Sequence, residues 1–254
     1  MPNGSPCPCA LKRALDGASS RRELLALGVS WEVWMATLPL LLRNEHLFVE
    51  TAGGLWLVDT GAPTSFGPAL TVAGEQFRLR NSSLGLTAET LSEFVGVECV
   101  GLLGADVLGR FDTVLDLPNG RVTISTDQLA HGGVAVRLDE WMGIPIVGVA
   151  IRGVAYRMFL DTGAQVSYFQ HETLTSFPAI GRVTDFYPGF GKFETETYAV
   201  DLRLGGFEFT LHCGQLPGLL GATLLVAGTH GVIGNHVVRD RQVGYFPRRS
   251  LLVL

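Results

Sequence analysis

Charge is scarce in this sequence, and no basic excess is present. Charged residues make up 17% of the 254 residues, and the formal net charge is -5. A chain of this kind has no general electrostatic reason to bind nucleic acid or an anionic membrane surface. We therefore expect neither partner. Nearly half of the residues are apolar, which is typical of an ordered, globular chain.

Cysteine is scarce as well, with four residues in the whole sequence. Cys7 and Cys9 lie close together near the start, whereas Cys99 and Cys213 lie far apart in apolar runs. This spacing does not form a disulfide framework. The Cys-Pro-Cys pair has no second pair of ligands nearby, so we expect no metal and no cofactor. The sequence favours a reducing, cytoplasmic location.

An uninterrupted apolar segment of membrane-spanning length is also lacking. The longest stretch without Asp, Glu, Lys or Arg runs from Phe209 to Val238, and glycines and Pro217 interrupt it. Such interruptions argue against a transmembrane helix. Basic residues near the N-terminus are mixed with acidic ones and lead into no clean apolar core, so a signal peptide is not predicted.

The sequence does contain an internal repeat that covers most of its length. The segments LWLVDTGAPTSF, around Asp59, and YRMFLDTGAQVSYF, around Asp161, share an Asp-Thr-Gly-Ala core after an apolar approach. Each core follows a stretch that predicts a pair of β-strands. Each half also closes with two apolar residues, a glycine, a short helical turn and a hairpin, which makes Gly104 and Gly234 equivalent. A repeat on this scale indicates two related lobes.

The positions of the repeated motifs predict a domain division. Ser20 and Glu23 fit a capping box, which predicts a short helix through Leu27 in an N-terminal extension. Short strands separated by frequent turns predict that the remainder is mainly β. The predicted divisions are the extension at 1–33, the first lobe at 34–126, a connection at 127–142 that could hold one strand, and the second lobe at 143–254.

The ordered pair of motifs resembles the aspartic proteases of the pepsin and retropepsin group over roughly residues 35–254. The resemblance implies a bilobal β fold whose lobes are related by a pseudo-twofold axis and share one cleft. Retroviral members build that site from two identical chains. This sequence resembles both halves fused, so we expect a monomer with retropepsin-like lobes. The implied activity is aspartic-type endopeptidase cleavage of peptide or unfolded protein, with pepstatin-like compounds as candidate inhibitors.

Asp59 and Asp161 are the predicted catalytic residues. Peptide hydrolysis needs one group to accept a proton from water and another to donate a proton to the leaving amine. Two carboxylates held about 3 Å apart cannot both ionise, so they share one proton and can perform both tasks. The two titration steps belong to the pair, and we assign the roles jointly.

The residues that follow each aspartate are expected to support it. The resemblance implies that two threonine hydroxyls link the loops across the lobes, and glycine permits close approach of backbone amides to the carboxylates. Alanine stands where pepsin-like enzymes usually carry Ser or Thr, which removes a hydrogen bond that favours the ionised carboxylate. We therefore expect activity in mild acid. The supporting residues are Thr60, Gly61, Ala62, Thr162, Gly163 and Ala164.

A segment that resembles the retropepsin flap follows the second aspartate only. The interval from Asp59 to Gly104 is 45 residues, whereas that from Asp161 to Gly234 is 73. The first lobe is therefore predicted to lack the flap and to pass directly to the strand behind it. A flap excludes water and grips an extended substrate. The predicted flap residues are Phe186, Tyr187, Pro188, Gly189, Phe190, Gly191 and Phe193; an ordinary glycine-rich hairpin with core aromatics is the alternative.

Two further alternatives stay open from the sequence. The missing flap leaves room for a catalytically silent module that binds peptides on the same fold. The extension at 1–33 lies outside both lobes and is a candidate autoinhibitory or processed segment, and further dimerisation is a related alternative.

Overall fold

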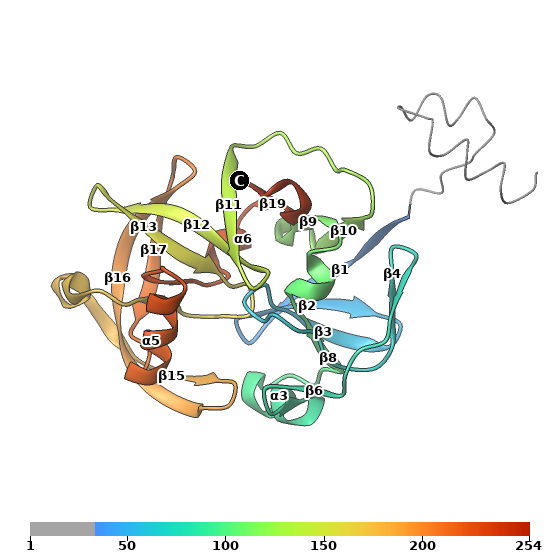
Figure 1. Cartoon of the computed structure of the whole chain (residues 1–254), viewed down its shortest axis with the longest axis horizontal. Helices are drawn as coiled ribbons and strands as arrows, with labels where there is room; N and C mark the ends of the chain where they lie inside the picture. Colours follow the sequence, from blue (N-terminus) through green and yellow to red (C-terminus); the bar gives the residue numbers. More distant parts are fainter. Residues whose placement is uncertain (1–33) are drawn as a thin grey trace, which may run out of the picture. The chain divides into compact units, whose positions relative to one another are not determined.

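The computed structural model describes residues 34–254, which form one compact unit (Figure 1). Strands dominate this unit, and the helices are few and short. The strands form two lobes joined through a shared sheet, so the predicted mainly β, bilobal fold is confirmed. The predicted N-terminal helix lies outside the described residues.

The first repeat places its elements in the following order. They are β1 (Met35–Arg43), β2 (His46–Thr51), β3 (Gly54–Val58), β4 (Leu70–Val72), β5 (Glu75–Phe77), β6 (Ser82–Ser83), β7 (Leu86–Thr87), α3 (Ala88–Val95), β8 (Gly101–Leu103), α4 (Ala105–Leu108), β9 (Asp112–Asp116), η1 (Leu117–Asn119) and β10 (Arg121–Ser125).

The second repeat has the same beginning and the same end. Its elements are β11 (Ala135–Trp141), β12 (Ile144–Ile151), β13 (Val154–Leu160), β14 (Ser167–Phe169), η2 (Glu172–Ser176), β15 (Ala179–Tyr187), β16 (Gly191–Leu204), β17 (Phe207–Gly214), α5 (Gly218–Val226), β18 (Gly231–Ile233), α6 (His236–Arg239), β19 (Gln242–Phe246), η3 (Pro247–Arg249) and β20 (Leu251–Val253).

Strands from both repeats form one antiparallel sheet between the lobes, in the order β11-β20-β19-β9-β10-β1. Its central pair, β9 with β19, joins the two repeats, with Asp116 opposite Gln242 and Thr113 opposite Tyr245. The β11 strand lies within the predicted connection and pairs with both β12 and β20. The lobes are therefore linked by backbone hydrogen bonds as well as by side chains.

The first repeat begins with three strands rather than the predicted two. In the first repeat, Asn44 and Glu45 have positive φ angles of 45° and 66°, which form a tight turn between β1 and β2. In the second repeat, Met142 and Gly143 form the equivalent turn, with φ angles of 54° and 80°. In the first repeat, the prediction of a single strand before the β2–β3 turn was wrong, because a short turn of this type fits within an apolar run. In the second repeat, the predicted strand pair is β12 and β13, joined at the predicted Arg152–Gly153 turn, and β11 is the strand that the connection could hold.

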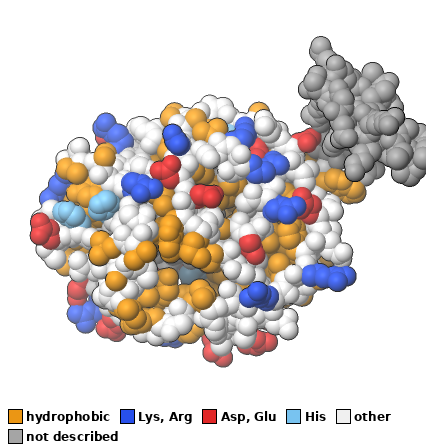
Figure 2. All heavy atoms as spheres, in the orientation of Figure 1, with side chains coloured by type: hydrophobic (Ala, Val, Ile, Leu, Met, Phe, Trp, Pro, Cys, Tyr) orange, Lys and Arg blue, Asp and Glu red, His pale blue; other side chains and the backbone are white. Residues whose placement is uncertain are grey.

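Two helices were not predicted. In the first repeat, α3 buries Leu91 and Val95 and exposes Glu89, so its pattern is amphipathic but only eight residues long. The equivalent helix α5 has nine residues and none of them is charged. It exposes Leu219, Leu225 and Val226, with exposed fractions of 76%, 77% and 78%. Hydrophobic side chains gather on the corresponding face of the molecule (Figure 2). Periodicity gave no signal for α5, because apolar residues surround the whole helix.

Candidate active site

Asp59 lies at the end of β3, in a loop held by backbone contacts. Its amide donates to the Leu103 carbonyl of β8 at 2.9 Å, which continues the parallel pairing of the two strands. Its carboxylate accepts a hydrogen bond from the Ala62 amide at 2.8 Å. The apolar residues before Asp59 are buried strand residues, so the sequence delivers the carboxylate from a rigid element.

Asp161 lies in the same position at the end of β13. Its amide donates to the Ile233 carbonyl of β18 at 2.9 Å. Its Oδ1 atom accepts hydrogen bonds from the amides of Gly163, at 2.9 Å, and Ala164, at 3.1 Å. The two loops thus present their carboxylates through the same local structure.

The two threonines link the loops in a reciprocal manner. The Thr60 hydroxyl donates to the Leu160 carbonyl at 2.7 Å and accepts from the Thr162 amide at 3.0 Å. The Thr162 hydroxyl donates to the Val58 carbonyl at 2.8 Å and accepts from the Thr60 amide at 3.1 Å. Both threonines are 2% exposed, so these four bonds form away from water. They hold the strands that end at the two aspartates against each other.

Glycine at the third motif position lets the opposite carboxylate come close. A Cβ atom on Gly61 would lie 2.3 Å from the Cγ atom of Asp161, and one on Gly163 would lie 2.5 Å from the Cγ atom of Asp59. Real Cβ atoms do not approach a carbon this closely, so only glycine fits at either position. Each loop therefore packs against the carboxylate of the other lobe.

The closing segment of each repeat supports its own motif loop. The Ala105 amide donates to the Ala62 carbonyl at 2.8 Å, and the Asn235 amide donates to the Ala164 carbonyl at 2.9 Å. A Cβ atom on Gly104, or on its equivalent in the second repeat, would lie 2.6 Å from the same carbonyl oxygen. A side chain at either glycine would push the loop away from its support.

The electrostatic environment favours one shared proton. Burial, the charge of Asp161 and the hydrogen bond with its carboxyl group raise the pKa of Asp59 well above the usual range. Burial also raises the pKa of Asp161, and its hydrogen bonds with Asp59 and with nearby amides partly offset this effect. Both side chains keep some contact with solvent, although protein atoms surround each carboxyl group. The pair can therefore hold one proton between its two carboxyl groups, so that one acts as an acid and the other as a base.

The predicted flap residues lie on the β15–β16 hairpin. The pairs Phe186 with Lys192 and Tyr187 with Gly191 end the ladder, and the Phe190 amide donates to the Tyr187 carbonyl at 3.0 Å. Burial, and then the charges of Asp161 and Asp59, raise the pKa of Tyr187, so the phenol lies within electrostatic range of the two aspartates. Pro188 and Gly189 form the turn between the strands.

The two remaining aromatic residues of this hairpin have different surroundings. Phe193 packs on the core beneath the hairpin, with its ring 6.1 Å from that of Tyr168. Phe190 is 45% exposed, and its ring meets that of Phe193 edge-on, with a centroid distance of 6.2 Å. Phe193 therefore anchors the hairpin, while Phe190 faces solvent.

Between Asp59 and Gly104, the first lobe does not pass directly to a single strand. It forms two small hairpins, β4–β5 and β6–β7, followed by α3. The strands of these hairpins are three and two residues long, against nine for β15 and fourteen for β16. The expected direct passage was therefore wrong, because the turns at Ala73–Gly74 and Leu84–Gly85 reverse the chain twice.

Sequence reasoning did not identify a buried polar group beside the second motif loop. His46 is 3% exposed, and its Nδ1 atom is 3.0 Å from the Gly163 carbonyl oxygen. Burial lowers its pKa, which favours the neutral ring. A second buried polar pair lies in the second lobe. The Tyr168 hydroxyl donates to one carboxylate oxygen of Asp185, and the other oxygen accepts from the Phe186 amide at 2.8 Å. No local pattern marks His46 or the Tyr168–Asp185 pair, since the bonded residues lie 117 and 17 positions apart.

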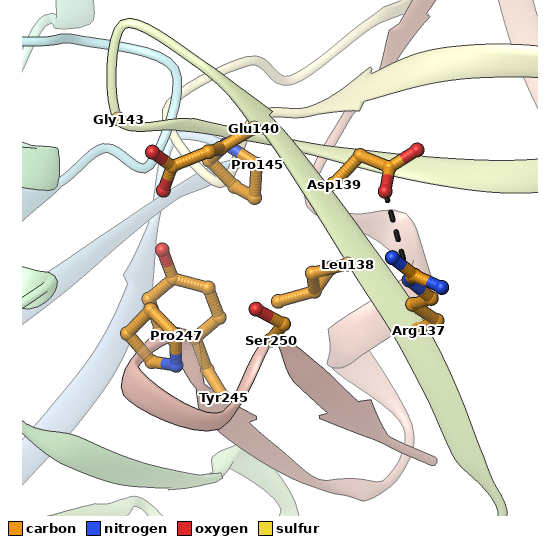
Figure 3. A pocket seen from close by; sticks show the side chains of 9 residues that line it. All are labelled: Arg137, Leu138, Asp139, Glu140, Gly143, Pro145, Tyr245, Pro247 and Ser250. Carbon is orange, nitrogen blue, oxygen red and sulfur yellow. Dashed lines mark ion pairs between the residues drawn. The ribbon is translucent and has the colours of Figure 1, made fainter.

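A separate hollow lies on the sheet between the lobes (Figure 3). Its volume is about 220 Å³. The carboxylate of Glu140 and the hydroxyl of Tyr245 point into it, and burial followed by the Glu140 charge raises the pKa of that tyrosine. No residue of either motif loop lines this hollow. It is therefore distinct from the site around the aspartates.

Within residues 34–254, no group of three or more His, Cys, Asp or Glu side chains is placed to hold a metal ion. None of the helices in this same range combines the length and the apolar character that crossing a bilayer requires.

Comparisons with known proteins give one kind of match. No protein-family model matches the sequence, and no curated protein matches it. Among solved structures, the aspartic proteinase from Irpex lacteus is similar, with a TM-score of 0.47 and 10% sequence identity. The match covers 86% of this chain and 96% of that protein. The likeness concerns the fold alone and carries no argument about activity.

Proposed function

We propose that the chain is an aspartic endopeptidase that hydrolyses peptide bonds in peptides or unfolded proteins. Asp59 and Asp161 are its catalytic residues, and they act on a water held between them. The observation that carries this proposal is the reciprocal packing of two identical loops, in which each motif glycine lies directly against the carboxylate of the other lobe. A purely structural aspartate at a turn does not require a second one opposite it.

The proposed reaction needs no cofactor. The ionised carboxylate accepts a proton from the water, whose oxygen attacks the carbonyl carbon of the peptide bond. The protonated carboxyl donates its proton to the carbonyl oxygen as the tetrahedral intermediate forms. As the intermediate collapses, the C–N bond breaks and the carboxyl that took the proton from the water donates it to the departing nitrogen. The other carboxylate regains its proton from a hydroxyl of the intermediate. Burial raises the pKa of both aspartates, which supports one shared proton, and the roles of acid and base are assigned to the pair jointly.

The flap is proposed to cover the bound substrate. Phe186, Tyr187 and Phe190 lie at its end, and Tyr187 is near both aspartates. An extended substrate would add main-chain hydrogen bonds along the hairpin, and the aromatic rings favour apolar side chains beside the cleaved bond. In this arrangement, the second lobe supplies the cover and the two lobes share the catalysis.

The test uses single substitutions of the two aspartates. Asp59→Asn and Asp161→Asn each remove one carboxyl group but keep the shape of the side chain. We expect cleavage of denatured protein at about pH 4 to 6 by the unmodified chain, and a loss of at least about 10³-fold in each variant. A pepstatin-like inhibitor should block the cleavage. Full activity in either variant would contradict the shared mechanism.

A catalytically silent peptide-binding module is the second candidate. The observation that favours it is the lack of a long hairpin between Asp59 and Gly104 in the first lobe. Retained binding of a pepstatin-like compound, with no cleavage at any pH, would support the module. Cleavage that the aspartate substitutions abolish would exclude it.

We also propose that the chain is a monomer and that it works in a reducing, cytoplasmic compartment. Cys99 and Cys213 are both buried and free, which agrees with such a compartment but does not require it. Size measurement by light scattering and fractionation of the source cells test the two statements separately. A stable dimer would favour the alternative in which two chains associate further.

A further inference from the structure

The flap hairpin of the second lobe contacts a helix of the first lobe. The ring of Phe94, on α3, stacks on the ring of Phe186, on β15, with a centroid distance of 4.6 Å and an interplanar angle of 12°. Phe186 directly precedes Tyr187, the residue near the aspartates. Figure 1 shows the end of β15 beside α3. The helix thus lies where it can hold the end of the flap.

Two more contacts lie on either side of this stack. The Lys192 ammonium group is 5.9 Å from the centroid of the Phe94 ring, which places a cation from β16 over the same helix residue. At the hairpin turn, a Cβ atom on Gly189 would lie 3.7 Å from the carbonyl oxygen of Leu84, in the turn between β6 and β7. Both strands of the flap and its turn therefore meet the first lobe.

The helix that receives the flap is held firmly. The Thr87 and Thr90 side chains form a capping box at its start, and Gly96 ends it in the left-handed conformation. Leu91, on the inner face of the helix, is fully buried. The Asn44 side chain, from the turn between β1 and β2, donates to the Gly96 carbonyl at 2.9 Å. A helix fixed at both ends and on its inner face can position what packs against it.

The contacts of the flap, in contrast, are few and lie partly in solvent. Phe94 and Phe186 are half-buried, and the exposed fraction of Leu84 is 63%. One aromatic stack with one cation on the ring favours the docked flap over a free one by a factor on the order of ten. A preference of this size holds the flap in place most of the time and still lets it open.

We propose that α3 is the docking site for the flap of the other lobe and that Phe94 is a positioning residue. Through its stack on Phe186 it holds the end of the flap, including the adjacent Tyr187, in place, and it releases the flap when substrate enters or leaves. The helix and the turn between β6 and β7 thus take the place of a second flap. The docking itself is independent of any activity, whereas its effect on catalysis rests on the proposed proteolysis.

Hydrogen exchange of the full chain tests the docking. In Phe94→Ala, we expect the amides of residues 186–192 to exchange about tenfold faster, while those of the hairpin base stay unchanged. Phe94→Tyr keeps the stack and should restore the slow exchange. Phe77→Ala is the matched control, because Phe77 is another half-buried aromatic of the first lobe and packs against Phe111 rather than the flap. Unchanged exchange at 186–192 in a folded Phe94→Ala variant would overturn the proposal.

Cleavage kinetics test the positioning. In Phe94→Ala, kcat/KM should fall about tenfold, and the Tyr variant should restore it. Combining Phe94→Ala with Phe186→Ala should cost no more than the larger single effect, because both remove the same contact. Additive losses would contradict a shared role. If exchange responds as expected but the unmodified chain never cleaves, the docking stands and the proposed proteolysis fails.

Discussion

At the scale of single residues, the hydroxyls of Thr60 and Thr162 link the backbones of the two motif loops. Each hydroxyl accepts from an amide and donates to a carbonyl of the opposite lobe. Few other side chains offer a donor and an acceptor on one atom in so little space. The strict pairing of the two lobes at this point therefore depends on two oxygen atoms.

Replacing one threonine by valine should destabilise the chain and impair the site. Thr60→Val keeps the shape but leaves buried backbone groups unpaired, which costs about 1–3 kcal/mol in the free energy of unfolding. Urea denaturation measures this loss. Thr60→Ser keeps the hydroxyl and is the matched control, with a cost expected to be about 1 kcal/mol or less. Equal destabilisation by Val and Ser would mean that the hydroxyl contributes no more to stability than the γ-methyl group, which contradicts the role given to the hydrogen bonds.

The raised pKa of Asp59 predicts how the stability depends on pH. Because the folded state binds this proton more tightly than the unfolded state, its contribution is fully present below the ordinary carboxyl pKa of 3.8. It is lost as the pH rises through the folded value. We therefore expect Asp59→Asn to gain stability relative to the unmodified chain between about pH 4 and 7. Parallel denaturation curves across this range measure the difference, and a constant difference would contradict the raised pKa.

The alanine that follows each motif glycine predicts the position of the pH optimum. Ala164 has no hydroxyl to donate to the ionised Asp161, although its amide does so at 3.1 Å. Ala164→Ser adds a donor beside the same carboxylate and should move the acid limb of the rate profile down by about half a unit to one unit. Rate measurements across pH check this, with Ala164→Gly as a variant that adds no donor. An optimum of the unmodified chain near about pH 2 would contradict the premise.

At the scale of elements, the turn between β1 and β2 fastens the first lobe to the closing helix of the second. The Asn235 side chain donates to the Glu45 carbonyl at 2.8 Å and accepts from Arg239, which also pairs with the Glu45 carboxylate. The same turn leads to His46 and its contact with the Gly163 loop. A short hairpin turn thus contacts the motif loop that belongs to the other lobe.

Removing Asn235 should weaken this connection. Asn235 is fully buried, and Asn235→Ala removes one donor to the Glu45 carbonyl and one acceptor for Arg239, which still bond to each other. We expect a cost of about 1–3 kcal/mol in the free energy of unfolding. The control is Arg203→Ala, which removes an exposed ion pair with Glu208 and should change stability by less than about 1 kcal/mol. Thermal or urea denaturation compares the two. Similar losses in both variants would mean that the turn is not a specific connection.

Several elements could be predicted from the sequence, and others could not, for a physical reason. The motif loops and their closing segments carry local signals, such as an aspartate after buried strand residues and a glycine at a close backbone approach. The contact of His46 with Gly163 joins residues 117 positions apart, and nothing near either residue announces it. The stack of Phe94 on Phe186 has the same property. Long-range packing decides these contacts, and residue patterns within short windows do not record it.

At the scale of the whole molecule, a buried carboxylate connects the two repeats near the centre of the shared sheet. Asp112 is fully buried on β9 and pairs with Arg248, at 3.0 Å, and Arg249, at 2.5 Å, on η3 of the second repeat. It also accepts from the Leu129 amide at 2.9 Å, which fixes the start of the connecting segment. One carboxylate therefore joins both repeats and the chain between them.

Removing that carboxylate should destabilise the entire unit. Asp112→Ala leaves two arginines beside an unpaired amide, and we expect a loss of about 3–5 kcal/mol in the free energy of unfolding. Asp112→Asn, which keeps an acceptor for the Leu129 amide, should lose less. Denaturation followed by two optical probes also shows whether the lobes unfold together. A loss below about 1 kcal/mol would show that water replaces the cluster.

The pairing of β9 with β19 has a consequence for how the chain can be divided. Neither half contains both central strands of the shared sheet, so each half alone would expose a long unpaired edge. A cut within residues 127–133 severs only a segment without helix or strand and leaves every ladder intact. The nicked product should therefore stay together as a two-chain assembly, and the two halves made separately should reconstitute it on mixing.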